Sequence, residues 1–190
     1  MENNVKGKLF VISGSSGVGK GTLLNALLLH HPEFRLSISA TTRPPRTGEV
    51  EGVNYFFTNK EDFKKAVENG EFLEWAEFNG NFYGTKQAWV EKTLNKGEHL
   101  LLEIETKGAL QIKEKLPDAF LIFIMPPSLE ELEQRLRGRN TEDELAIQNR
   151  LKEAFREIEC SKYYDCRVVN DNLERALKEL EYIICNHIKA

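Results

Sequence analysis

The chain has 190 residues, with 26 Lys and Arg against 30 Asp and Glu, which gives a formal net charge of −4. Its 41% hydrophobic and 29% charged residues are typical of a globular protein and exclude disorder, collagen and coiled coil for the chain as a whole. The negative charge argues against a general nucleic-acid binder, which needs a surplus of Lys and Arg. At this length we expect one domain with its own hydrophobic core.

Neither a membrane segment nor a zinc site is predicted. The longest apolar run covers residues 119–125, far short of the roughly 20 residues that cross a bilayer, and the N-terminus has no signal-peptide pattern. Three cysteines without a CxxC pair fit free thiols in a reducing compartment, and the histidines show no zinc-ligand spacing. We therefore expect a cytoplasmic protein with no membrane partner. Whether it is a monomer or a homodimer is left open by the sequence.

The hydrophobic pattern predicts alternating strands and helices. Residues 9–12 are a continuous apolar run, as in a strand buried on both faces, and leucines at helical spacing follow until Pro32. Similar runs predict strands at residues 100–104, 120–124 and 167–169, each before a helical stretch. This alternation indicates an α/β fold with a parallel sheet core flanked by helices.

Two regions depart from this pattern. Residues 37–83 hold short strand-like pieces, several glycines and one predicted helix that ends at Gly70, so we interpret them as an insertion in the core. Residues 128–131 and 141–144 each match the capping box of a helix N-terminus. They predict two helices joined by a polar hinge.

The strongest chemical signal is a glycine-rich loop between the first strand and the first helix. Its residues are Gly14, Ser15, Ser16, Gly17, Val18, Gly19, Lys20, Gly21 and Thr22. Such loops turn backbone N–H groups towards phosphate oxygens at a helix N-terminus, and their lysine reaches the β and γ phosphates. A nucleoside triphosphate with Mg²⁺ is the expected ligand. Because Gly21 follows Lys20 where Ser or Thr is usual, the metal ligand stays open, with Thr22 as the candidate.

A second basic motif lies in the predicted insertion. Arg43 and Arg46 are three residues apart on a segment stiffened by two prolines. Two guanidiniums at this spacing are suited to fork around a phosphate, although a surface loop of solvated arginines is the plainer interpretation.

Together, four segments resemble the guanylate kinase family. They are GSSGVGKGT, SATTRPPRTGEVEGVNYFF, FLEWAEFNGNFYGT and EQRLRGRNTEDE, which occur in the family's order and spacing. The resemblance covers about residues 8–188. It implies transfer of the γ-phosphoryl group of ATP to GMP, and to dGMP, giving ADP and GDP in purine nucleotide metabolism and GMP recycling.

The resemblance also implies an architecture, a P-loop NTPase fold in a single domain of residues 1–190. The core would comprise about residues 1–36, 93–127 and 151–190. An inserted GMP-binding subdomain would cover about residues 37–92, and a mobile lid about residues 128–150.

For the acceptor, the resemblance places Ser39, Glu74 and Thr85 at the guanine base. A carboxylate there can accept from both N1–H and the 2-amino group, a donor pair that adenine lacks. The remaining expected GMP contacts are Arg43, Arg46, Tyr55 and Tyr83 at the phosphate, and Glu103. The nearby aromatic residues are expected to pack the subdomain: Phe72, Trp75, Phe78 and Phe82.

For ATP, the resemblance implies contacts from the whole glycine-rich loop and from Arg135, Arg139 and Asn170. The alternative role of Asn170 is the N-cap of the last helix. Lid arginines would stabilise the charge that spreads over phosphate oxygens during transfer. The residues expected to act on the transferred group are Lys20, Arg46, Arg139 and Arg150. No general base is required, because the GMP phosphate is already an anionic nucleophile.

One segment departs from the family pattern. Where the family usually has Asp-x-Asp and then Gln-Gly, the sequence is Glu103-Ile104-Glu105-Thr106-Lys107-Gly108, with longer acids and Lys107 in place of an amide. A lesser departure is Ser15, where proline is frequent.

Two alternative functions share the fold. One is a non-catalytic module that binds phosphopeptides, and the other is a kinase of a different phosphorylated small molecule. The first would be expected to lose phosphate-loop residues, which are kept here, and the second would not need Glu74.

Overall fold

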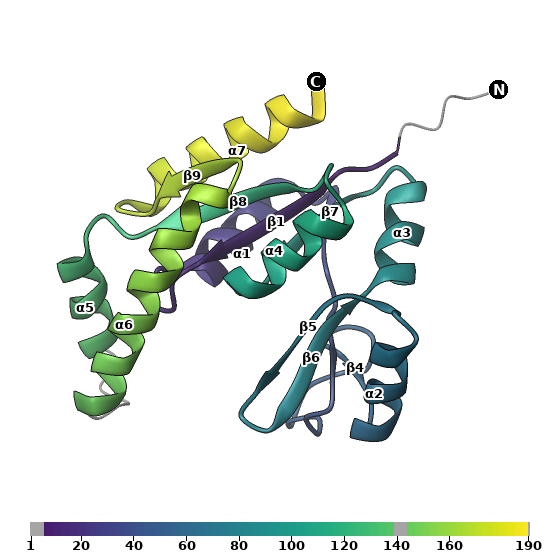
Figure 1. Cartoon of the computed structure of the whole chain (residues 1–190). Coiled ribbons are helices and arrows are strands. Elements are labelled where there is room, and N and C mark those ends of the chain that lie inside the picture. Colours follow the sequence, from purple (N-terminus) through teal and green to yellow (C-terminus); the bar gives the residue numbers. More distant parts are fainter. Residues whose placement is uncertain (1–5, 139–143, 190) are drawn as a thin grey trace.

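The structure is a computed structural model that describes residues 6–138 and 144–189. Within these ranges the chain forms a five-stranded main sheet and a four-stranded second sheet (Figure 1). Helices flank the main sheet, and the second sheet lies to one side of it (Figure 1). The architecture is the predicted α/β arrangement with a parallel core.

The main sheet is parallel throughout, with the strand order β2-β7-β1-β8-β9. Its strands are β1 (Leu9–Gly14), β2 (Phe34–Leu36), β7 (His99–Glu103), β8 (Phe120–Met125) and β9 (Cys166–Val169). All four strands predicted from apolar runs are present. The fifth, β2, has no such run because it is three residues long and buries only Phe34.

Helices cover both faces of the main sheet, with α1 (Lys20–His30) and α7 (Leu173–Lys189) on one face and α3 (Gln87–Asn95) and α4 (Thr106–Lys115) on the other. Alternate strand residues face the two layers: Phe10 and Ile12 pack in the first, Leu9 and Val11 in the second. This is why the central strands are apolar without interruption. No helix in the two described ranges is both long enough and apolar enough to cross a membrane.

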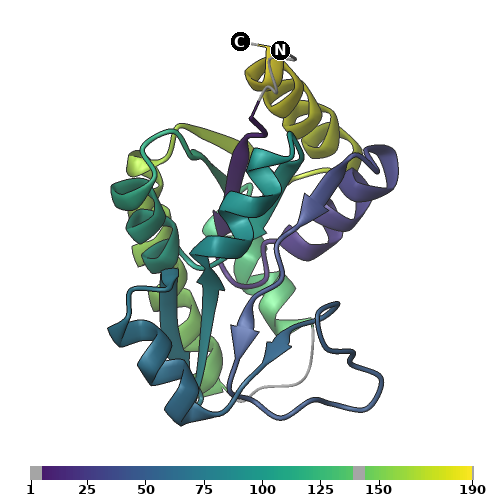
Figure 2. The ribbon, with the colours of Figure 1, turned by 90° about the vertical axis from the view of Figure 1, so that its right-hand side faces the viewer.

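The second sheet is built from the predicted insertion, in the order β4-β3-β6-β5. Its elements are β3 (Ala40–Thr41), β4 (Phe56–Phe57), α2 (Lys60–Glu68), β5 (Phe72–Phe78) and β6 (Asn81–Lys86). Gly70 follows α2 with φ of +70°, the left-handed conformation that commonly ends a helix, as predicted. Figure 2 shows the long connection between β3 and β4 reaching out beyond the sheet. The expected boundary at residue 92 falls inside α3, which packs in the main core.

The expected lid contains α5 (Leu129–Arg137) and the start of α6 (Glu144–Cys160), which a short 3₁₀ turn, η1 (Ser161–Tyr163), follows. The Ser128 hydroxyl accepts a hydrogen bond from the backbone N–H of Glu131 at 3.1 Å, which caps α5 as predicted. Thr141 of the second predicted capping box lies outside the described residues. α6 continues without a break through the expected lid boundary at residue 150.

The core of the second sheet depends on one aromatic side chain of α2, and its removal makes a prediction. Phe63 is 1% exposed, and its ring stacks on Phe72 and Phe82 with centroid distances of 4.4 and 5.5 Å. We expect Phe63→Ala to lower the free energy of unfolding by about 3–5 kcal/mol. Because this cluster is separate from the main core, hydrogen exchange should accelerate in β5 and β6 but not in β1.

Leu29→Ala is the control, since Leu29 is 83% exposed and should leave exchange in both sheets unchanged. Equal loss of protection in β1 and β5 for the Phe63 variant would show that the two cores unfold as one unit.

Candidate active site

Two cavities lie near the edge where the parallel strands end. β1 leads into the phosphate loop, β7 into Glu103, and β9 into Asn170. Ligands of α/β sheets bind at this carboxyl edge. One cavity, of about 440 Å³, lies beside the phosphate loop, and the other, of about 240 Å³, lies between the second sheet and the start of α4.

The first cavity gathers six of the twelve residues predicted to bind ATP. Those that line it are Gly17, Val18, Gly19, Thr22, Arg135 and Asn170, together with Gly138, Asp171 and Leu173. Gly19 has φ of +91°, and a Cβ there would lie 2.7 Å from the Asn170 amide nitrogen, so both backbone and space require glycine. The remaining loop residues Gly14 and Ser15 are buried, and Ser16 and Gly21 are exposed.

Asn170 is fixed against the loop and is not a helix cap. It is 8% exposed and donates its side-chain amide to the Val18 carbonyl at 2.8 Å. Arg135 of α5 donates to the Asn170 carbonyl at 3.1 Å. The capping role at α7 belongs to Asn172, whose side chain accepts from the Arg175 N–H at 3.1 Å. Asn170 therefore forms part of the cavity wall and does not cap α7.

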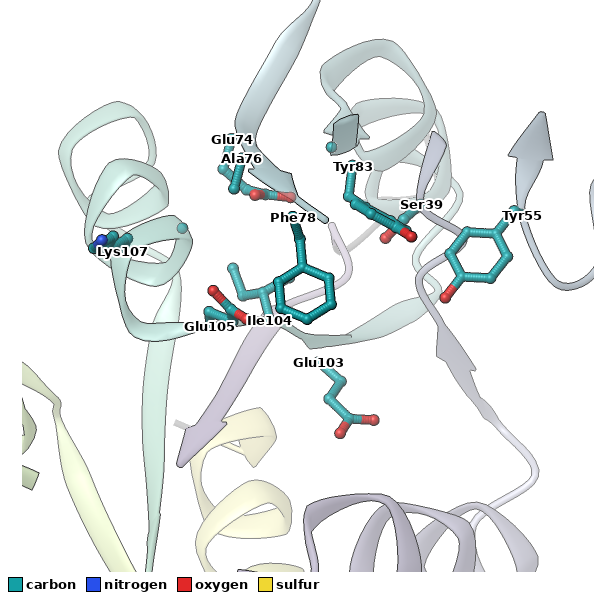
Figure 3. Close-up of a pocket in the computed structure, with 12 residues that line it drawn as sticks. Ser39, Tyr55, Glu74, Ala76, Phe78, Tyr83, Glu103, Ile104, Glu105 and Lys107 are labelled. Atoms are coloured by element: carbon teal, nitrogen blue, oxygen red, sulfur yellow. The ribbon is translucent and has the colours of Figure 1, made fainter. Parts of the chain in front are cut away.

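Lys20 is folded back onto its own loop. Its ammonium donates to the carbonyl of Gly14 and, at 3.5 Å, to that of Ser15. Burial lowers the pKa of Lys20, and nearby carboxylates, of which Glu103 has the largest effect, oppose this. Glu103 therefore lies close to both cavities. Its charge acts on Lys20 of the phosphate loop, and its side chain lines the second cavity, pointing away from Glu74 (Figure 3).

The second cavity holds five of the eight residues predicted to bind GMP, namely Ser39, Tyr55, Glu74, Tyr83 and Glu103 (Figure 3). Residues that the prediction missed also line it: Ala76, Phe78, Gly84, Ile104, Glu105, Lys107 and Gly108. The ring of Phe78, expected to pack the subdomain, lies instead at the cavity and is 58% exposed. The reason is its position at the end of β5, beyond the reach of the Phe63 cluster.

Glu74 is the buried charge of this cavity. It is 6% exposed, and the Thr85 hydroxyl donates to its Oε1 at 2.7 Å. Burial raises the pKa of Glu74, while its hydrogen bonds with Thr85 oppose the rise. Thr85 itself does not line the cavity, so it acts on the site through Glu74. The other carboxylate oxygen can accept from a ligand.

The remaining predicted phosphate contacts cluster on the connection between β3 and β4. The Arg43 guanidinium lies 5.4 Å above the Tyr55 ring, whose centroid is 6.2 Å from that of Tyr83. Arg43 also pairs with Glu49 at 2.7 Å, and Glu49 accepts the Arg46 N–H at 2.7 Å. This hydrogen bonding raises the pKa of Arg43 and lowers that of Glu49.

Glu49 was not predicted as the partner of these arginines, although its position three residues after Arg46 could have indicated it. It follows Arg46 by three residues across Gly48, which has φ of +87°, so the chain turns back on itself there. The Arg46 side chain is exposed on the same connection. Arg150 is half-buried on α6 and is not among the residues lining either cavity. Arg139 lies outside the described residues.

Comparison with known proteins identifies the family. The family model described as guanylate kinase matches residues 6–187. The chain belongs to the guanylate kinase family. It is 56% identical over 171 residues to a guanylate kinase of Synechococcus sp. (strain CC9311), covering 90% of each chain. It is 52% identical over 179 residues to one of Clostridioides difficile (strain 630), covering 94% of this chain and 87% of the relative.

A solved structure of a guanylate kinase also matches. The crystal structure of the guanylate kinase from Anaplasma phagocytophilum gives a TM-score of 0.76 at 34% identity, covering 98% of this chain and 88% of that chain. The predicted guanylate kinase resemblance, the enzyme class of nucleoside monophosphate kinases and the P-loop NTPase fold are thereby confirmed.

Gly108 offers a test of how this guanylate kinase family member holds Glu74. A Cβ on Gly108 would lie 2.8 Å from Oε2 of Glu74, so the carboxylate would have to move. We expect Gly108→Ala to raise the KM for GMP about 10–100-fold, equivalent to about 1.5–3 kcal/mol for one lost hydrogen bond to a charged group. The KM for ATP should stay unchanged. Steady-state kinetics measures both, and an unchanged KM for GMP would contradict the placement of the base beside Glu74.

Proposed function

We propose that this chain transfers the γ-phosphoryl group of ATP to GMP, and to dGMP, releasing ADP and GDP. The observation that carries the acceptor's identity is Glu74, a buried carboxylate that faces a cavity beside the carboxyl edge of the sheet. Burying a charge is costly unless a partner compensates for it. A guanine base would supply that partner, with N1–H and the 2-amino group donating to the two oxygens.

The arrangement of charges supports the same acceptor. Tyr55 and Tyr83 line the cavity, and Arg43 lies against the Tyr55 ring, where a base held by Glu74 would present its phosphate. Arg46 is close by in sequence and exposed, so it is available to a dianion. The pair of Arg43 with Glu49 keeps the guanidinium ordered until a phosphate replaces the carboxylate.

ATP would occupy the first cavity, with its phosphates in the glycine-rich loop. Lys20 would exchange the carbonyls of Gly14 and Ser15 for phosphate oxygens, which are stronger acceptors for an ammonium group. Asn170 and Arg135 border the part of this cavity that would receive the adenosine. Arg150 of α6 and Arg139 would contact the ATP phosphates when the lid closes.

Mg²⁺ would enter with the nucleotide. Within residues 6–138 and 144–189 no group of three or more His, Cys, Asp or Glu could hold a metal ion. This fits Mg²⁺, which commonly uses one or two protein oxygens together with phosphates. Thr22 is exposed and lines the first cavity, and it is the residue that would bind the ion. When bound, the ion neutralises charge on the phosphates.

Catalysis would then rest on positioning and charge. The GMP phosphate is already a nucleophile, so no side chain has to remove a proton. The chain would position two anionic groups for transfer, with Lys20 on one side and Arg43 and Arg46 on the other. Neither alternative function gains support, because each relative named above is a guanylate kinase.

The acceptor is tested by measuring ADP formation from ATP and Mg²⁺ with GMP, dGMP, AMP, CMP, UMP and a ribose phosphate in separate assays. Turnover confined to the guanine nucleotides is the expected result. No turnover with any acceptor, from protein that still binds GMP, would contradict the proposal and favour a binding module.

Lys20→Ala should abolish transfer while leaving the fold intact. The reason is that its ammonium is expected to stabilise the transferred charge, which neighbouring backbone groups cannot replace. Loss of about 10³-fold or more in kcat, with an unchanged circular dichroism spectrum, is the expected outcome. A kcat within tenfold of the wild type would contradict the role of Lys20.

Glu74→Gln tests base recognition. Glutamine keeps the shape but replaces one acceptor with a donor, so discrimination of GMP over AMP in kcat/KM should fall about 10²-fold or more. Glu77→Gln is the matched control, because Glu77 is an exposed acid of the same strand, β5, and should leave the ratio unchanged. Full preference for GMP in the Glu74 variant would remove Glu74 from the base site.

A further inference from the structure

An aromatic side chain at the second cavity has no aromatic partner in the described residues. Phe78 is 58% exposed and lines the cavity that holds Glu74. Within residues 6–138 and 144–189 no other aromatic ring packs against it, whereas Trp75 of the same strand lies 5.9 Å from Phe82 between ring centroids. In the view of Figure 3, the Phe78 ring lies between the side chains of Glu74 and Glu103. Packing of the second sheet therefore does not explain this aromatic residue.

The period of β5 decides which of its residues face the cavity. Glu74, Ala76 and Phe78 alternate along the strand and all line the cavity, while Trp75 and Glu77 between them do not. At a rise of roughly 3.3 Å per residue, Phe78 lies about 13 Å along the strand from Glu74. Ala76, with its small side chain, separates the two. Glu74 and Phe78 therefore border two ends of one strip of the cavity, with space between them.

A second apolar side chain borders this space from the main sheet. Ile104 follows β7 and also lines the cavity. A Cβ on Gly108 would lie 3.3 Å from Cδ1 of Ile104 and 2.8 Å from Oε2 of Glu74. The methyl group of Ile104 and the Glu74 carboxylate are therefore close neighbours. A ligand that donates to Glu74 would meet apolar groups that come from both sheets.

This combination suits a flat aromatic ligand. A carboxylate accepts from donors at the edge of a base, and an aromatic side chain stacks on the face of any base. A phosphate group, in contrast, gains nothing from Phe78 or Ile104. Covering the Phe78 ring with a base also removes its apolar surface from water, which is favourable.

We propose that Phe78 is a base-binding residue: its ring covers one face of the guanine whose edge Glu74 holds, and Ile104 contacts the base from the main sheet. The inference rests on the proposed function in taking GMP as the ligand of this cavity. Recognition of the acceptor is then divided between two residues of one strand. Glu74 selects guanine, and Phe78 adds affinity that does not depend on the identity of the base.

Phe78→Trp turns the proposed contact into a spectroscopic signal, because a stacked guanine quenches the fluorescence of an indole. The full chain is titrated with GMP, without ATP, and the wild type gives the baseline of its two tryptophans, Trp75 and Trp89. We expect GMP to quench the variant more strongly than the wild type, and ribose 5-phosphate to cause no additional quenching. Quenching by GMP no larger than in the wild type would overturn the proposal.

Phe155→Trp is the matched control for the probe. Phe155 lies on α6, is 51% exposed and is not among the residues that line either cavity. An indole at this position should respond to GMP no more than the wild type does.

Steady-state kinetics of Phe78→Ala gives a second, independent measurement. Loss of a base-stacking ring should raise the KM for GMP about 5–150-fold, with kcat little changed. The ratio of kcat/KM for GMP over AMP should stay as in the wild type, unlike in Glu74→Gln, because stacking tolerates any base. Phe78→Tyr keeps the ring and should restore the KM.

Stability separates a binding role from a structural one. Because Phe78 is largely exposed and lies outside the Phe63 cluster, Phe78→Ala should unfold at a temperature close to that of the wild type. Phe155→Ala is the control for removing an exposed phenylalanine and should leave the KM for GMP unchanged.

Two outcomes distinguish this inference from the proposed function. An unchanged KM for GMP in Phe78→Ala, in a chain whose wild type phosphorylates GMP, would overturn the role of Phe78 and leave the acceptor as proposed. Absence of GMP binding to the wild type would instead overturn the proposed function itself.

Discussion

The site depends on the common direction of the strands in the main sheet. Because β1, β7 and β9 run parallel, the segments that follow them emerge at one edge. This brings the phosphate loop, Glu103 and Asn170 together although they are far apart in the chain. The contacts are close: a Cβ on Gly19 would collide with the Asn170 amide. An antiparallel neighbour would have carried its loop to the opposite edge.

Charges at this edge are partly removed from water, and the chain itself supplies a partner for each. Lys20 bonds to loop carbonyls, Arg43 pairs with Glu49, and Glu74 accepts from Thr85. A phosphate is a stronger acceptor for Lys20 and Arg43 than these partners are, and Glu74 keeps an oxygen that can accept a further donor, so the substrates proposed here would leave no buried charge unpaired. Because these partners offset the cost of burial only in part, burial lowers the pKa of Lys20 and raises that of Glu74.

Helix α4 connects the two sheets. It packs in the main core, while its Lys115 donates to the Phe72 carbonyl at 2.8 Å and its Gly108 leaves room for Glu74. The second sheet has only a small aromatic core of its own, centred on Phe63. The proposed base site therefore takes its carboxylate from one sheet and its rigidity from the helix of the other.

The central strands, the phosphate loop and the start of α5 could be predicted from the sequence, because each depends on residues adjacent along the chain. The family could be predicted because four motifs occur in its order and spacing. It did not reveal β2, whose single buried residue leaves no pattern, or the cavity position of Phe78. The bond of Asn170 to Val18 and the closeness of Gly108 to Glu74 could not be predicted from the sequence. The two residues of each pair are far apart along the chain, and only the packing of the elements that carry them brings them together.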